Sequence, residues 1–216
     1  MKSIAGFSLL LYRPVEQLYQ THIMHSTFVR EVKSGMLPQH VFNLFLVLDY
    51  QYLTKFSEAV REIYSKSEAA HQAHLSEIQA QTKAEHARLK QWLQRQSISL
   101  DEYDKVWADY GDHLYDAAQK EVAAVGLAAI FPCFLFFNEM GADFKRAGIC
   151  NKNPYHDWMR FYAEASLESG VQSIASLINL YAEVVDEKTK DKMKSVFWIS
   201  AQYEATIFSN LSLVMQ

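Results

Sequence analysis

Apolar residues recur at spacings of three and four along most of this chain, which is the period of an amphipathic α-helix. In residues 39–64, Phe42, Phe45, Leu46, Tyr52 and Phe56 share one helix face. Glycine, proline and polar residues separate the periodic segments. The pattern predicts helices over residues 4–12, 39–64, 100–119, 121–143, 154–168, 171–185 and from 190 onward. A more polar, outer helix is marked by Leu75, Ile78, Leu89 and Trp92 and continues to about residue 94.

Breaks between these helices are predicted at Gly35 with Pro38, at residues 96–99, from Gly141 to Pro154, at Ser169-Gly170, and at residues 186–190. The sequence shows no repeat, low-complexity tract or interdomain linker. We therefore expect one all-α domain over residues 1–216, a bundle of about eight or nine helices.

The composition agrees with a large helical core. Of the 216 residues, 50 % are hydrophobic, and only seven are glycine and four proline. This excludes a disordered chain and disfavours a turn-rich β fold. The longest apolar run, residues 123–137, is too short to span a membrane and contains Pro132, so we expect a buried core helix and no membrane partner.

The net charge bears on the kind of binding partner, and the cysteine content bears on the cellular compartment. The formal net charge is −4 and no dense cluster of Lys and Arg is present, which argues against nucleic acid as a partner. The two cysteines, Cys133 and Cys150, are too few for a disulfide framework. A reduced, cytoplasmic protein is the simpler interpretation.

Three reactive side chains interrupt apolar helix faces. Asp49 and Glu204 are carboxylates, which are costly to bury without a partner. Each is either a structural hydrogen-bonding group or part of a site, with Asp49 suited to an aminopyrimidine edge and Glu204 to proton transfer. Cys133 follows Pro132 in the apolar helix, where most free cysteines are inert and buried and a minority are nucleophiles.

The positions of the eight histidines give little support for a metal or haem site. The pairs Glu68/His71 and His74/Glu77 have the i, i+3 spacing of di-iron bundles, but no second helix supplies the rest of such a site. A haem ligand at His22 or His25 is an alternative, although an isolated histidine is more often structural. We expect no metal and no cofactor.

Several motifs occur in an order that resembles one known family. They are His25-Ser-Thr-Phe28-Val, Gly35-Met-Leu37-Pro38, the run from Phe45 to Phe56, Pro132-Cys133, Glu139-Met-Gly141 and Tyr203-Glu204. This arrangement, from about His22 to Phe208, is similar to the TenA family of thiaminase II enzymes. The resemblance implies a haem-oxygenase-like fold without haem, a homotetramer, and a thiamin-salvage hydrolase that replaces the amine of an aminomethylpyrimidine by water. Thiamin would be a secondary substrate.

The resemblance also implies residue roles. The nucleophilic cysteine corresponds to Cys133, the pyrimidine-binding aspartate to Asp49 and the acid/base glutamate to Glu204. The substrate-pocket residues correspond to Tyr52, Tyr110, Phe137 and Tyr162.

Two positions depart from the family pattern, because Leu48 replaces a glutamine and Phe137 replaces a tyrosine. These changes leave open weaker activity, an altered substrate, or a protein that binds a pyrimidine without catalysis. A haem-binding protein of the same fold is a further alternative.

Overall fold

The chain folds into a helical bundle. The computed structural model describes residues 4–164 and 167–213, and within these ranges it contains helices and no β-strand. The helices are α1 (Gly6–Tyr12), α2 (Glu16–Leu18), α3 (Thr27–Ser34), α4 (Gln39–Ser65), α5 (Gln72–Arg95), α6 (Lys105–Lys120), α7 (Ala123–Ala147), α8 (His156–Glu164), α9 (Leu167–Val184) and α10 (Glu187–Leu213). Short 3₁₀ turns at Arg13–Val15 and Ala69–His71 and a π-helical segment at Tyr19–Met24 connect some of them. The predicted all-α class is confirmed.

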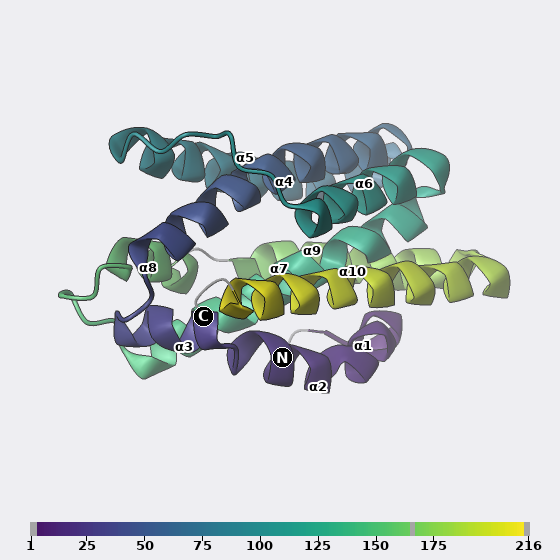
Figure 1. Cartoon of the computed structure of the whole chain (residues 1–216). Helices are drawn as coiled ribbons and strands as arrows, with labels where there is room; N and C mark the ends of the chain where they lie inside the picture. The colour runs from purple at the N-terminus through teal and green to yellow at the C-terminus, as the bar shows by residue number, and fades with distance from the viewer. Residues whose placement is uncertain (1–3, 165–166, 214–216) are drawn as a thin grey trace.

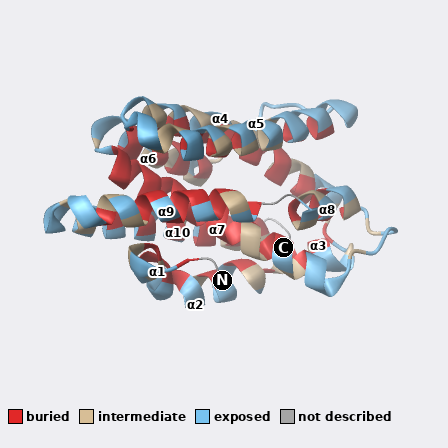
Figure 2. Cartoon of the chain, turned by 180° about the vertical axis from the view of Figure 1, so that it is seen from behind, coloured by how far each residue is buried: buried red, intermediate tan, exposed pale blue. Residues whose placement is uncertain are grey.

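The helices form three tiers (Figure 1). Helices α4, α5 and α6 make the upper tier, α7, α9 and α10 the middle tier, and α1 to α3 the lower tier, with α8 at one end. Helix α7 packs against α6, α8, α9 and α10 and therefore lies at the centre. Buried residues line the inward sides of the helices, while the outward sides are exposed (Figure 2).

The central helix α7 carries the long apolar run found in the sequence. By length and composition it could cross a membrane, but 89 % of its most apolar window is buried inside the protein. The run is apolar because other helices surround it on several sides, as expected for a buried core helix. Helix α7 also continues through Pro132 without ending there.

Capping residues set several helix ends. Gly35 ends α3 in the left-handed conformation at φ 76°, which confirms the predicted break there. The Asp104 side chain accepts hydrogen bonds from the backbone N–H groups of Val106 and Trp107, so α6 begins at Lys105 rather than at residue 100. The Asp186 side chain likewise accepts from the Thr189 N–H, which places the start of α10 at Glu187.

Two predicted breaks include a glycine that lies inside a helix, although the chain does leave α7 after Ala147 and enter α8 at His156. Gly141 lies inside α7 and Gly170 inside α9. A Cβ atom at Gly141 would clash with the backbone carbonyl of Tyr162, and one at Gly170 would clash with the side chains of Gln81 and Phe134. These glycines allow close helix packing, which a sequence pattern does not distinguish from helix termination.

Candidate active site

The residues predicted as a site lie in the interior between the upper and middle tiers. All seven have buried side chains, with at most 8 % of each residue exposed. They come from five helices: Asp49 and Tyr52 from α4, Tyr110 from α6, Cys133 and Phe137 from α7, Tyr162 from α8 and Glu204 from α10.

An aromatic stack positions Glu204. The rings of Tyr52 and Tyr110 are stacked with centroids 4.8 Å apart, and Tyr203 stacks on the other side of Tyr110 at 5.2 Å. The Tyr110 hydroxyl donates a hydrogen bond of 3.1 Å to Oε1 of Glu204. Because aromatic rings lose little entropy when they are fixed in a stack, this arrangement holds the carboxyl group of α10 against α6.

Asp49 has an incomplete set of hydrogen bonds. Its side chain is 3 % exposed, and its buried Oδ2 atom has no partner among the described residues. An unsatisfied acceptor of this kind is costly in a folded protein, which makes the site a good receptor for a ligand with N–H donors. The sequence alternatives of a rim position or a satisfied helix–helix contact do not fit this burial.

Glu85, on α5, is a site residue that the sequence analysis missed. The Tyr162 hydroxyl donates a hydrogen bond of 2.5 Å to its Oε1 atom. Its position continues an inward stripe of α5 at spacings of three and four, formed by Leu75, Ile78, Thr82, Leu89 and Trp92. A carboxylate among these inward, mostly apolar positions could have indicated a site in the sequence. It is hard to recognise there because the rest of α5 is polar.

A small pocket connects Glu85 with the thiol. It is lined by Glu85 and Cys133 together with Leu53, Phe56, Phe134, Phe137 and Leu167. The pocket has room for about one water molecule, so a pyrimidine ring enters only when the lining side chains move. Wider surface hollows, such as the one bordered by Lys145 and Arg160, contain none of the predicted site residues.

Three carboxyl groups share this interior and hold protons more tightly than usual. Burial raises the pKa of Glu85 to about 7, against the opposing hydrogen bond from Tyr162. Burial also raises the pKa of Glu204 to about 8, where the Tyr110 hydrogen bond lowers it and the charge of Glu85 raises it. The pKa of Asp49 is raised by burial and then by Glu85 and Glu204. The site therefore titrates near neutral pH.

The same surroundings keep Cys133 protonated. Burial raises the pKa of its thiol, and the charges of Glu204 and Glu85 raise it further. Because a thiolate is the nucleophilic form of cysteine, a reaction at this sulfur would require a base to accept the thiol proton. The carboxyl groups of Glu204 and Glu85, whose charges act on this thiol, are suitable acceptors when ionised.

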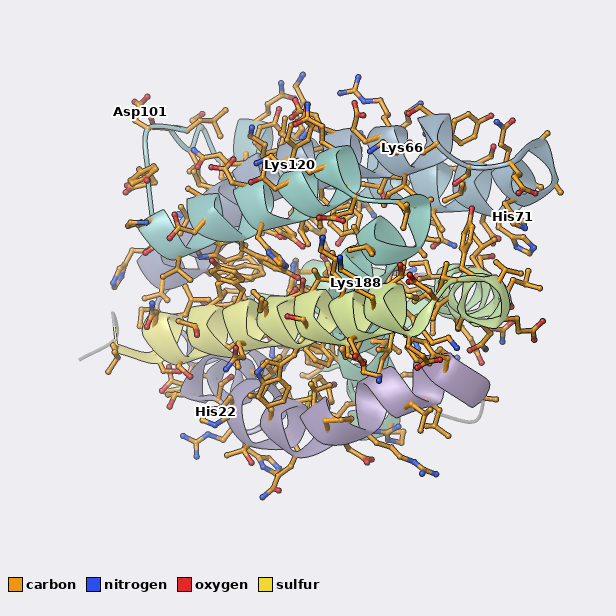
Figure 3. The ribbon with its side chains drawn as sticks, turned by 90° about the vertical axis from the view of Figure 1, so that its right-hand side faces the viewer. His22, Lys66, His71, Asp101, Lys120 and Lys188 are labelled. Carbon is orange, nitrogen blue, oxygen red and sulfur yellow. The ribbon has the colours of Figure 1, made fainter. Side chains whose placement is uncertain are left out.

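The histidines considered as metal or haem ligands lie elsewhere. His22 and His25 are exposed, and Figure 3 places His22 on the lowest tier and His71 at the end of the upper tier. His71 contacts the Tyr181 hydroxyl at 3.1 Å, and Ser173 contacts both His74 and Glu77. No group of three or more His, Cys, Asp or Glu side chains that could hold a metal ion occurs in the described ranges.

Comparison with known proteins identifies the family to which nearly the whole chain is similar. The model of the TENA/THI-4/PQQC family matches residues 12–210. The chain belongs to this family. TenA membership accounts for the ordered motifs found in the sequence.

Curated relatives share the family at low identity. A protein named aminopyrimidine aminohydrolase from Halalkalibacterium halodurans is 20 % identical over 207 residues, with 92 % of each chain covered. One of the same name from Bacillus subtilis is 26 % identical over 191 residues, covering 82 % of this chain and 78 % of that one.

A solved TenA homologue from Pyrococcus furiosus has the same fold, with a TM-score of 0.85 at 20 % identity. The match covers 96 % of this chain and 100 % of that one.

The two departures from the TenA pattern occupy different surroundings. Leu48 is buried at 3 % exposure among core residues of α4. Phe137 lies one helical turn after Cys133, lines the same pocket, and packs on the Tyr162 ring with centroids 5.1 Å apart. The missing hydroxyl at Phe137 is therefore a change within the pocket.

Proposed function

We propose that this protein is an aminopyrimidine aminohydrolase of thiamin salvage. The observation that carries the proposal is the buried Oδ2 atom of Asp49, which has no protein partner and lies in the same charged cluster as Cys133 and Glu204. The names of the curated relatives support the same reaction. Thiamin, whose thiazolium would be the leaving group, is a secondary substrate.

Asp49 would bind the amidine-like edge of the ring. An exocyclic amine next to a ring nitrogen presents hydrogen-bonding groups side by side, which a carboxyl group complements with its two oxygens. Because Asp49 retains a proton more readily than an ordinary aspartate, it can donate to the ring nitrogen and accept from the amine. Tyr52, Tyr110, Phe137 and Tyr162 supply aromatic surface for the flat ring.

The reaction begins at Cys133. Its sulfur forms a bond to a ring carbon as the thiol proton passes to an ionised carboxylate, and the displaced electron pair moves through the ring toward the substituent. The C–N bond then breaks, and the amine leaves as ammonia with a proton from Glu204, producing an exocyclic methylene group.

Water completes the reaction. Its oxygen adds to the methylene carbon while a carboxylate takes its proton, and the ring electrons return to expel the sulfur. Cys133 regains a proton, and the net change is amine plus water to alcohol plus ammonia. Carboxyl groups with pKa values of about 7 and about 8 suit such repeated proton transfer near neutral pH.

Ammonia release from 4-amino-5-aminomethyl-2-methylpyrimidine tests the proposal. We expect turnover by the unchanged protein and a loss of about a thousandfold or more in Cys133→Ser, with an unchanged melting temperature. Cys150→Ser is the matched control, because Cys150 is exposed and lies outside the site.

Two results would contradict the mechanism. Normal turnover by Cys133→Ser would exclude the cysteine adduct. Binding of the pyrimidine without turnover by the unchanged protein would instead support the non-catalytic alternative, in which the raised pKa of Cys133 and the loss of the hydroxyl at Phe137 prevent reaction.

A further inference from the structure

The reaction described above uses Glu85 only as a nearby carboxyl group for proton transfer and gives it no contact with the substrate, yet this residue lines the pocket. Apart from Cys133, the other residues that line this pocket are apolar, so Glu85 is its principal polar group. Its Oε1 accepts the Tyr162 hydroxyl, and no hydrogen bond from another described residue reaches its Oε2. A carboxylate oxygen facing an otherwise apolar pocket is available to a ligand.

The cluster also lacks a compensating cation. Asp49, Glu85 and Glu204 are all acidic, and none of the ion pairs found within the described ranges involves them. A buried carboxylate is stabilised by a positive charge that also donates hydrogen bonds. Glu85, the carboxyl group that lines the pocket, therefore favours a cationic ligand with N–H donors.

We propose that Glu85 is a specificity-determining residue that binds the substituent of the substrate as an alkylammonium group. This assignment rests on the proposed function and extends it to the chemical class of the leaving group. Asp49 holds the ring edge, Glu204 supplies the proton that makes the amine an ammonium group before it leaves as ammonia, and Glu85 provides the countercharge. Substrates whose substituent is a protonated amine are selected over the same ring with a neutral alcohol, which is the product.

The assignment explains how product leaves. After the reaction the nitrogen has left as ammonia, and the aminomethyl substituent has become a hydroxymethyl group, which carries no charge. The ionic hydrogen bond to Glu85 is lost at that step, so the pocket holds the product less tightly than the substrate. Tyr162 acts as a positioning residue, because its hydroxyl fixes one oxygen of Glu85.

Calorimetric titration in the Cys133→Ser background tests this assignment, because that protein binds without turnover. The two ligands are 4-amino-5-aminomethyl-2-methylpyrimidine and its 5-hydroxymethyl counterpart, titrated at about pH 8, where an aliphatic amine is protonated. Glu85→Gln removes the charge and keeps an oxygen for the Tyr162 hydroxyl. Glu77→Gln is the matched control, since Glu77 is a partly buried glutamate on the same helix that bonds Ser173 outside the pocket.

We expect Glu85→Gln to weaken the aminomethyl ligand about ten- to hundredfold and the hydroxymethyl ligand less than about threefold. Glu77→Gln should change neither. Equal weakening of both ligands, or no weakening of the aminomethyl ligand, would overturn the role of Glu85 and leave the proposed function intact. Failure of both ligands to bind the Cys133→Ser protein itself would overturn the proposed function and this assignment with it.

Discussion

The raised pKa of Glu204 predicts a specific loss of stability in alkaline solution. In the folded protein its pKa is about 8, against the usual 4.5, chiefly because the carboxyl group is buried. Below the lower value both folded and unfolded chains carry the proton. Between the two values only the folded chain keeps it, so the unfolded state gains stability as the pH rises, and above about 8 the difference becomes constant.

The magnitude follows from that window. One pH unit within this window changes the free energy of unfolding by about 1.4 kcal/mol. Between about pH 6 and about pH 9, roughly two pH units lie below the folded pKa of about 8. Glu204 alone therefore lowers the free energy of unfolding by about 2–3 kcal/mol over this range. For a chain of this size that is about 5–10 °C in melting temperature.

Urea denaturation at the two pH values, at one fixed protein concentration, measures the effect. Glu204→Gln keeps an acceptor for the Tyr110 hydroxyl and removes the titration, so its stability should fall by about 2–3 kcal/mol less than that of the unchanged protein. Glu77→Gln controls for the loss of a glutamate outside the site. If Glu204→Gln and the unchanged protein lose the same free energy between the two pH values, Glu204 does not titrate in the folded site as described.

Four further expectations follow from the fold. Phe137→Tyr should change the melting temperature by less than about 2 °C and alter pyrimidine affinity or turnover, because Phe137 lines the pocket; a large loss of stability with unchanged substrate handling would place its ring in sealed core instead. Gly141→Ala should destabilise the protein by about 1–3 kcal/mol in denaturant titration, since its Cβ would push on the Tyr162 carbonyl, and full stability would contradict the close packing of α7 and α8. Exposed apolar residues such as Leu180, Val184 and Trp198 suggest subunit contacts, so sedimentation at micromolar concentration should show a tetramer and not a monomer. Added haem should produce no Soret band, and a band lost in His22→Ala or His25→Ala would argue for haem binding.

Much of the site could be predicted because its residues break the helical pattern. Asp49, Cys133 and Glu204 are reactive groups on apolar faces, which is visible in the sequence without a structure. Tyrosine is common in helical cores, so the roles suggested for Tyr52, Tyr110 and Tyr162 depended on the family resemblance. The structure brings these tyrosines to the same interior.

The misses have a common physical origin in helix packing. The sequence pattern predicts helix breaks at Gly141 and Gly170 because glycine either ends a helix or allows a close helix contact, and only the neighbouring helix distinguishes the two. Glu85 was overlooked because its helix is mostly polar, and its inward position becomes clear only beside α4, α8 and α9. In each case the missing information was the identity of the contacting helix.

The site draws on helices far apart in the chain, and this has a consequence for its synthesis. Asp49 and Cys133 are made well before Glu204, which lies on α10, the last helix, and α10 packs along α7. Since chains emerge from their N-terminus, α7 lacks this cover until α10 has been synthesised. During that interval the thiol of Cys133 is more open to oxidants than in the finished protein, where it is 8 % exposed.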